Sequence, residues 1–314
     1  MNKNRYDGAK VLVTGYGFVS PYVTEQLVNA GAEVTVVEKD PLALAVGRGK
    51  IRNFNNVEYI NGNLGELFNR KFDYVYHLAG VTNVRYAENN PIEAYEENVI
   101  TTLKLLKHIE IKERLLFTSS AVVYGNSGSR SVITEDIPLG SQSIYGDTKI
   151  AAEALIHSLA QRLGFKYTIA RFFNLYGPGQ SQIYLIPQLI KQALMEGQIT
   201  VWNTKTIRDF LFVGDAVECI TSAVFHPQYE NSSLNVGSGF GRSVKDVADE
   251  VASLIGNSIE VRSLEKYDPA SPMVLISDIS KARLMGWNPK KNFTEGLRET
   301  IRYMSGEIAV SLPA

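Results

Sequence analysis

The chain has 314 residues, of which 45% are hydrophobic and 21% charged, and its formal net charge is −1. It is long enough to bury a large core, and its near-zero charge argues against nucleic acid or a membrane as a partner. The single cysteine, Cys219, excludes an internal disulfide, and the four scattered histidines lack the spacing of a metal site. With no signal peptide and no bilayer-spanning apolar run in the sequence, we expect a cytoplasmic protein.

Strand-like runs alternate with helix-like runs through about residue 177. We expect strands near 11–14, 33–38, 57–60, 73–78, 114–119 and 166–171. Long helical patterns fall near 91–110 and 143–163. This alternation predicts an α/β protein with a Rossmann-type, doubly wound parallel sheet over residues 1–177. Residues 178–314 mix short strands and helices and would form mainly a smaller C-terminal substrate-binding lobe.

The first predicted strand is followed by a Gly-x-Gly-x-x-Ser segment at residues 15–20, between a strand and a helix. In this context Gly15 would allow a tight turn and Gly17 the close approach of a pyrophosphate at the helix N-terminus. Ser20 replaces the third glycine of the motif; it is small enough for close packing and can also cap the helix. The alternative is a plain glycine turn in an α/β protein.

Glu38 ends the second predicted strand. A carboxylate at this place can hold the hydroxyls of an adenosine ribose. It would also repel a 2′-phosphate, which favours NAD over NADP. Lys39, directly beside it, weakens that preference.

Tyr145 and Lys149 lie four residues apart, one turn along the second long helix. A phenol, with a pKa of ~10, becomes a base at neutral pH only where a cation stabilises its anion. Bringing that pKa to about 7 takes roughly 4 kcal/mol. One cation ~6 Å away at an effective dielectric of ~20 supplies about 2.8 kcal/mol, so a second positive charge, such as an oxidised nicotinamide, would close the gap. Taken alone, the pair could also be one buried ring and one solvated amine.

Further segments follow in an ordered series: 77–80, Asn98, 171–179, 208–210, 234–239 and 278–287. With the motifs above, they resemble the extended short-chain dehydrogenase/reductases, the NAD-dependent nucleotide-sugar epimerase/dehydratase family, from about Lys10 to Met304. The resemblance implies NAD as cofactor and a nucleotide-diphosphate sugar as substrate. It also implies that part of the C-terminal half returns to the main sheet.

The resemblance assigns roles residue by residue. Tyr145 would be the acid/base, Lys149 would bind the nicotinamide ribose, and Ser120 would hydrogen-bond the reacting hydroxyl. NAD contacts are implied for Gly15, Gly17, Phe18, Val19, Glu38, Asn63, Leu64, Leu78, Ala79, Gly80, Asn98, Ser119, Tyr145, Lys149 and Phe172. Substrate contacts are implied for Thr82, Asn174, Arg208 and Leu275, with Arg208 on the diphosphate. Alternatively, Asn98, Asn174 and Phe172 could fill the core, and Arg208 with Asp209 could form a surface ion pair.

The chain departs from the family in two places. Dehydratases carry an Asp-Glu pair, and decarboxylases a Glu, where this chain has Ala121 and Val122, which cannot transfer a proton. Where relatives offer a second arginine to the diphosphate, this chain has Asp268, which would repel it unless Lys266 or Arg262 takes over. The substrate could therefore be an unusual nucleotide sugar, or not one at all.

These observations favour a nucleotide-sugar 4-epimerase that acts through a transient 4-keto sugar. The alternatives are a one-way NAD(P)-dependent sugar or alcohol oxidoreductase, or a dehydratase, that uses the same triad of Ser120, Tyr145 and Lys149, and a non-catalytic cofactor-sensing protein. Where relatives can hold a bulky aromatic near the sugar's C2 substituent, this chain has Leu275, so a 2-acetamido sugar should be accepted; Leu275 could also be ordinary core. We expect a homodimer through the two long helices, which carry Leu103, Leu106, Leu155, Ile156 and Leu159.

Overall fold

The computed structural model describes residues 5–44, 57–125, 132–256, 258–264 and 274–311. The chain divides into two compact units, each of which contains segments from different parts of the sequence. The first unit comprises Met1–Asn126, Glu135–Phe172 and Val217–Val236. The second unit comprises Ser127–Thr134, Phe173–Ala216 and Gly237–Ala314. The chain thus leaves the first unit after Phe172 and returns to it at Val217.

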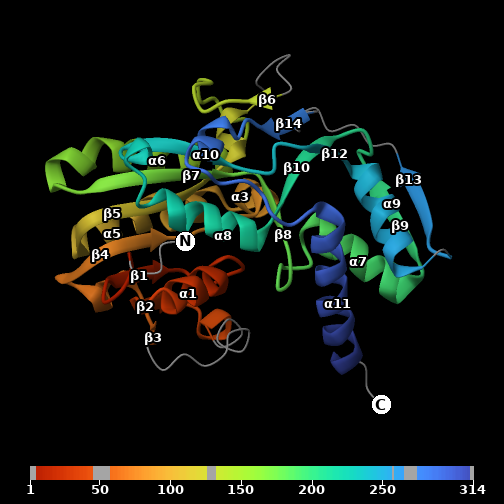
Figure 1. The fold of residues 1–314 in the computed structure, drawn as a ribbon, viewed down its shortest axis with the longest axis horizontal. Helices are drawn as coiled ribbons and strands as arrows, with labels where there is room; N and C mark the ends of the chain where they lie inside the picture. Colours follow the sequence, from red (N-terminus) through yellow and green to blue (C-terminus); the bar gives the residue numbers. More distant parts are fainter. Residues whose placement is uncertain (1–4, 45–56, 126–131, 257, 265–273, 312–314) are drawn as a thin grey trace. The chain divides into compact units, whose positions relative to one another are not determined.

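A seven-stranded sheet forms the centre of the first unit (Figure 1). Its spatial order is β11 (Ser232–Val236), β7 (Lys166–Phe172), β5 (Ile109–Ser120), β4 (Arg70–His77), β1 (Lys10–Thr14), β2 (Glu33–Glu38) and β3 (Val57–Asn61). Every neighbouring pair is parallel. Because successive strands are added outward on both sides of β1, the predicted Rossmann-type doubly wound sheet is confirmed.

Two central strands begin earlier than the sequence pattern predicts. β4 begins at Arg70 and β5 at Ile109, and these early residues pair with each other in parallel register. The register then shifts between Phe72 and Tyr74. Charged side chains interrupt the apolar pattern in both segments, so tertiary pairing, rather than local hydrophobicity, extends these strands.

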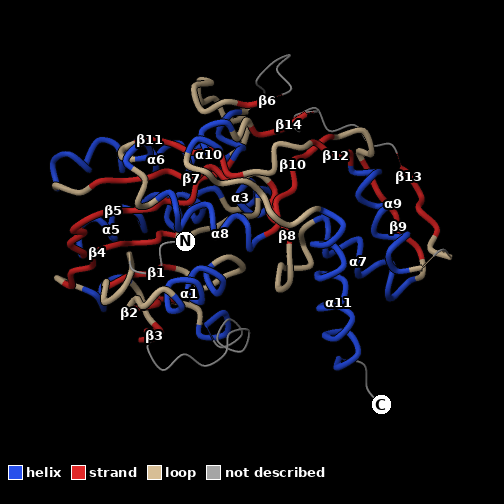
Figure 2. The backbone as a smooth tube through the Cα atoms, in the orientation of Figure 1, coloured by secondary structure: helices blue, strands red, loops and turns tan. Residues whose placement is uncertain are grey.

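The helical segments of the first unit are α1 (Ser20–Asn29), η1 (Leu64–Leu67), α3 (Val84–Asn89), α4 (Pro91–Tyr95), the π-helical turn η2 (Glu96–Ile100), α5 (Thr101–His108), η3 (Ala121–Tyr124), α6 (Ile144–Leu163) and η4 (Pro227–Tyr229). The tube drawing in Figure 2 separates these helices from the strands of the sheet. α8 (Val213–Ala223) carries the chain from the second unit back into the first.

Two expectations about helix ends were wrong in detail. α1 begins at Ser20 itself, with Val19 in the N-cap position and no side-chain cap, so Ser20 does not cap this helix. The helix predicted near 91–110 is three consecutive segments and ends at His108, because Ile109 already has the extended backbone of β5. The helix predicted near 143–163 is α6, with the Ser143 side chain accepting from the Gly146 N–H.

The core of the first unit explains how α6 is oriented. Ala152, Ile156 and Ala160 lie four residues apart on α6, and all are buried in the same cluster as strand residues Leu115 and Phe117. Burial of this stripe fixes the rotation of the helix about its axis. The packing of this stripe therefore also determines the direction in which side chains in the earlier turns of α6 point.

The second unit has a five-stranded sheet of β12 (Gly241–Ser243), β10 (Ile207–Phe212), β14 (Val274–Ser277), β6 (Val132–Ile133) and β8 (Asn174–Tyr176). β9 (Gln198–Trp202) and β13 (Glu260–Leu264) form a separate parallel pair. Its helices are α7 (Leu185–Glu196), α9 (Val244–Ile255), α10 (Ser280–Leu284) and α11 (Phe293–Ser311). β10 is the central strand, with β8 and β14 parallel and β12 antiparallel to it.

Candidate functional site

The loop after β1 makes a tight turn at Gly15. This residue has φ +76°, and its N–H donates to the carbonyl of Val37 at 2.9 Å. A β-carbon on Gly17 would meet no described atom within 4 Å, so the space beside Gly17 is open. Phe18 and Val19 are half-buried and lead directly into α1, whose first backbone N–H groups have no partner within the helix.

Glu38 at the end of β2 is tied to this turn. Its Oε2 accepts the N–H of Tyr16 at 2.7 Å, and its Oε1 accepts the N–H of Asp40 at 2.9 Å. Lys39, the neighbour that weakened the preference for NAD, has its Nζ 2.5 Å from the carboxylate of Glu97. The structure therefore brings a carboxylate to the glycine turn and engages the adjacent cation elsewhere.

Asn63 and Leu64 follow β3 and have local structural roles. The Asn63 side chain accepts the N–H of Gly65 at 2.8 Å and caps η1. Leu64 is buried in the core of the first unit. Any contact of Leu64 with a ligand would therefore come from its backbone.

The loop after β4 contains Leu78, Ala79 and Gly80. The Leu78 N–H donates to the carbonyl of Thr14 at 3.1 Å, which holds the loop beside the end of β1. Gly80 has φ +139°, and a β-carbon there would lie 2.2 Å from Oδ1 of Asn98.

Asn98, in η2, is buried and links this loop to α6. Its Nδ2 donates to Thr148 Oγ1 at 2.8 Å and to the carbonyl of Val81 at 3.2 Å. Among the described residues its Oδ1 has no hydrogen-bond partner. Asn98 is therefore buried, as the alternative of a core residue expects, and it keeps one buried acceptor that no described residue satisfies.

The structure gathers the predicted catalytic residues Ser120, Tyr145 and Lys149 at the carboxyl end of β5. Ser120 is the last residue of β5, and its Oγ accepts the N–H of Val122 at 3.4 Å. Tyr145, in the first turn of α6, is 7% exposed and packs with a small apolar cluster that includes Val122. Phe172, the last residue of β7, is the register partner of Ser120.

Lys149 is buried one turn after Tyr145. Its Nζ donates to the carbonyl of Thr118 at 3.0 Å and lies 6.0 Å from the centroid of the Tyr145 ring. Burial lowers the pKa of Lys149 to about 8, and the negative charge of Glu153 opposes that shift. The solvated amine of the alternative interpretation is excluded, because the ammonium is held at the end of β5.

Three of the predicted substrate residues lie in the sheet of the second unit. Arg208 on β10 is the register partner of Leu275 on β14, and Asn174 on β8 is the partner of Phe210. Burial lowers the pKa of Arg208, and Leu275 is only 6% exposed. Asn174 has a buried Nδ2 with no hydrogen-bond partner among the described residues. Thr82 lies exposed in the first unit.

Asp209 does not form the surface ion pair that the sequence left open. Its carboxylate is fully buried and accepts the N–H groups of Ser238, Gly239 and Ser277 at 2.7 to 3.1 Å, together with both serine hydroxyls. Asp209 therefore joins β10, β14 and the loop after β11. Asp268 and Lys266 lie outside the described residues, and Arg262 pairs with Glu260.

A model of the NAD dependent epimerase/dehydratase family matches residues 11–237. The chain belongs to this family. UDP-glucuronic acid decarboxylase 1 of Xenopus tropicalis is 30% identical, over 96% of this chain and 73% of its own length. UDP-glucose 4-epimerase of Lactobacillus helveticus is 28% identical, over 90% of this chain and 92% of its own. The structure of a Thermus thermophilus UDP-glucose 4-epimerase complex with NAD is 26% identical, with a TM-score of 0.81 over 95% of this chain and 99% of that one.

Family membership confirms the resemblance seen in the sequence: the protein is an enzyme and its cofactor is NAD. The residues present fit that cofactor. Gly17 leaves open space at the turn, and Glu38 offers carboxylate oxygens at the end of β2. Asn98 Oδ1 and Ser119 Oγ are buried acceptors without a partner among the described residues, as expected of groups that a ligand satisfies.

One ion pair of this region was not predicted from the sequence. Glu153, four residues after Lys149, pairs with Arg171 on β7 inside the first unit. The only signal was a Tyr-x-x-x-Lys-x-x-x-Glu spacing, which places all three side chains along one face of a helix. The partner, 18 residues away on a neighbouring strand, could not be read from that spacing.

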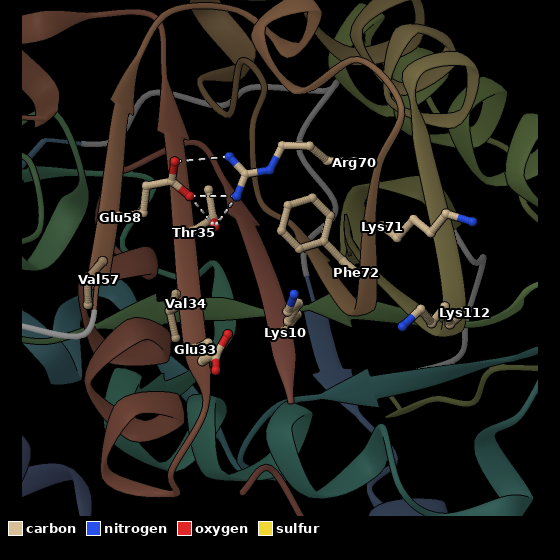
Figure 3. Close-up of a pocket in the computed structure, with 10 residues that line it drawn as sticks. All are labelled: Lys10, Glu33, Val34, Thr35, Val57, Glu58, Arg70, Lys71, Phe72 and Lys112. Atoms are coloured by element: carbon tan, nitrogen blue, oxygen red, sulfur yellow. Dashed lines mark hydrogen bonds and ion pairs between the residues drawn. The ribbon is translucent and has the colours of Figure 1, made fainter. Parts of the chain in front are cut away.

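A cavity of about 720 Å³ lies where the strands of the first unit's sheet begin, at the other end of the strands from the candidate site (Figure 3). It is lined by Lys10, Glu33, Val34, Thr35, Val57, Glu58, Arg70, Lys71, Phe72 and Lys112, at the starts of β1 to β4 and early in β5. Since ligands of such sheets bind at the carboxyl ends of the strands, this cavity is not the cofactor site.

Two further observations concern metal and membrane. Within the described parts of the chain, no group of three or more His, Cys, Asp or Glu side chains could hold a metal ion. No helix in those parts is long and apolar enough to cross a membrane.

Proposed function

We propose that the protein is a nucleotide-sugar 4-epimerase. The observation that carries this proposal is the surroundings of Tyr145: a buried lysine lies one turn away, and apolar Val122 packs against the same cluster. Ala121 and Val122 occupy the two positions where elimination or decarboxylation would need a proton-transferring side chain. One acid/base group suits a reaction that removes and returns the same proton.

In this mechanism Tyr145 as phenolate takes the proton of the sugar's C4 hydroxyl. The Lys149 ammonium stabilises the phenolate, and the Ser120 hydroxyl orients the reacting oxygen. When bound, NAD⁺ supplies reversible oxidation of the carbon that bears this hydroxyl. After the 4-keto sugar has rotated within the pocket, Tyr145 returns the proton to the product. Burial of Tyr145 keeps bulk water away from this exchange.

Arg208 and Asn174, which the family resemblance assigns to the substrate, both lie in the second unit. Arg208 would bind the diphosphate, since a guanidinium forms paired hydrogen bonds to phosphate oxygens. The buried Asn174 Nδ2 is a donor suited to a sugar or phosphate oxygen. The names of the relatives from Xenopus and Lactobacillus support a UDP-sugar. Between their two activities, Val122 in place of a glutamate favours the epimerase.

The proposal is tested by mass spectrometry of ligand released from purified protein, followed by assay of a nucleotide-sugar panel. We expect interconversion of one C4 epimer pair without net NADH accumulation. Tyr145→Phe should remove turnover and spare NAD binding, whereas Lys149→Met should weaken both. Wild-type turnover by Tyr145→Phe would refute the mechanism. Net NADH accumulation would indicate the one-way oxidoreductase, and tight NAD binding without turnover of any sugar would indicate the binding protein.

We also propose a homodimer, through residues partly different from those expected. Leu106 and Ile156 face the core, and Leu159 packs against it. Leu103 is 42% exposed, and Ile92 and Tyr95 on the same run of helices are 74% and 40% exposed.

A dimer would cover these side chains. Light scattering at micromolar concentration should give a mass of two chains for the wild type. The Ile92→Glu variant should give the mass of a single chain. The control is Leu284→Glu, at a residue 71% exposed in the second unit, which should stay dimeric. A wild-type monomer would contradict the proposal.

A further inference from the structure

Glu153 on α6 and Arg171 on β7 form a buried ion pair inside the first unit. Their side chains are 6% and 7% exposed. The pair is two-pronged: Arg171 Nη2 donates to Oε2 at 2.7 Å, and Nε donates to Oε1 at 3.2 Å. Burying two charges carries a desolvation cost that can exceed their mutual attraction. Such a pair is therefore weak evidence for stability and invites a functional explanation.

The pair joins the segments that carry the catalytic residues. Glu153 lies one turn after Lys149 on the same helix. Arg171 directly precedes Phe172, and its register partner on β5 is Ser119. Arg171 Nη1 also donates to the Tyr124 hydroxyl, at 3.0 Å, in the turn that follows Ser120. One guanidinium thus contacts the catalytic helix and the turn after the catalytic serine.

The charged groups around Lys149 come from several elements. On α6, Glu153 is the anionic group that acts on it, and Tyr145 presents its ring. On β4, burial lowers the pKa of His77 to about 3, so this imidazole is neutral at physiological pH.

Three further titratable groups interact with Glu153, and one of them is Tyr167 on β7, whose pKa is raised by burial and by the Glu153 charge. Arg171, on β7, is a cation held against the Glu153 carboxylate. Burial raises the pKa of Tyr124, in η3, so its hydroxyl is neutral. Glu153 is consequently the negative charge that favours the ammonium form of Lys149 in a buried environment.

We propose that Glu153 is a positioning residue for the Tyr145–Lys149 pair: locked by Arg171, its carboxylate holds α6 against β7 and keeps Lys149 cationic. This inference rests on the proposed roles of Tyr145 and Lys149. Burial lowers the pKa of Lys149 toward neutral pH, and the Glu153 carboxylate one turn away opposes that shift. Loss of this negative charge should therefore lower the Lys149 pKa further and reduce the share of charged lysine at neutral pH.

The test is an NMR titration of the NAD-free protein labelled with ¹³Cε-lysine, with the Lys149 signal assigned by its loss in Lys149→Met. In Glu153→Gln the titration midpoint should fall by roughly one pH unit relative to wild type. Asp147→Asn is the matched control, since it removes one carboxylate from the same helix at a half-exposed position, where solvent screens the charge. Its midpoint should remain that of the wild type.

Glu153→Gln leaves Arg171 buried without its partner and could fail to fold. The double variant E153Q/R171M removes both charges and should also lower the midpoint, because the charge of Glu153 acts on Lys149 whereas Arg171 is not among the groups that shift its pKa. An unchanged midpoint in the folded single variant, or in the double variant where the single does not fold, would overturn the proposal and leave the pair purely structural. Since no substrate is present, this result is independent of whether the enzyme is a 4-epimerase.

Discussion

Gly15 and Ala79 pack so closely that a β-carbon on Gly15 would lie 2.7 Å from the Cα of Ala79. Gly15 also has φ +76°, where an L side chain adds about 1–2 kcal/mol of strain. We expect Gly15→Ala to lower the free energy of unfolding by at least that amount, because the clash is with backbone and cannot be relieved by a rotamer change. Chemical denaturation measures this loss, and unchanged stability would show that the turn rearranges.

Gly17→Ala is the matched substitution, since its new β-carbon would meet no described atom within 4 Å. Its stability should remain within about 0.5–1 kcal/mol of wild type. NAD affinity should nevertheless fall at least tenfold if the pyrophosphate approaches Gly17 as the family motif implies. Isothermal titration decides this, and full NAD affinity in Gly17→Ala would remove Gly17 from the cofactor site.

NAD should bind more tightly than NADP, because the Glu38 carboxylate lies at the glycine turn. Glu38→Ala should narrow the preference. Glu97→Gln should also raise NADP affinity, by a few-fold, because it releases Lys39 from an exposed ion pair worth about 0–1 kcal/mol. Titration of each variant with both cofactors tests this, and tighter binding of NADP by the wild type would refute the assignment of Glu38.

Acid should destabilise the fold through His77. Its Nδ1 lies 2.7 Å from Thr14 Oγ1 and its Nε2 lies 2.9 Å from Thr102 Oγ1. Burial, aided by the charge of Lys149, lowers the pKa of His77 to about 3, whereas an unfolded histidine has ~6.5. Below pH ~6.5 the unfolded chain binds a proton that folded His77 does not. The free energy of unfolding therefore decreases as pH falls from about 6.5 to 3, by at most roughly 5 kcal/mol.

His77→Gln should make the free energy of unfolding less steep in pH over this window, even if it lowers stability at pH 7. Denaturation curves at half-unit steps from pH 4 to 7 measure the slope. A slope identical to that of the wild type would assign acid sensitivity to other groups.

Leu275→Tyr addresses the substrate. If Leu275 faces the sugar, the added volume should selectively reduce kcat/KM for a 2-acetamido sugar. The discrimination between the two sugars should change by about 1–3 kcal/mol, or by more where the whole acetamido group clashes. Its 6% exposure and its place opposite Arg208 make overpacking the competing outcome. Assay of both sugars separates the two, since equal losses would mean that Leu275 only supports packing.

The sequence predicted the features that depend on local geometry. The glycine turn, the alternation of strands and helices and the placement of Tyr145 one turn before Lys149 all follow from backbone periodicity and short spacing. The motif order was enough to recognise the family. The early starts of β4 and β5 were missed because pairing between strands, rather than their own apolar pattern, creates them.

Contacts between distant residues were decided by the tertiary structure. Nothing in the sequence around Asn98 shows that its Nδ2 meets Thr148, 50 residues later, while its Oδ1 stays unsatisfied. Likewise, only the fold shows that Asp209 is a buried acceptor and that Glu153 meets Arg171. Periodicity tells which face of an element is apolar, but the partner that a polar group finds depends on how that face packs, because burial makes such pairing obligatory.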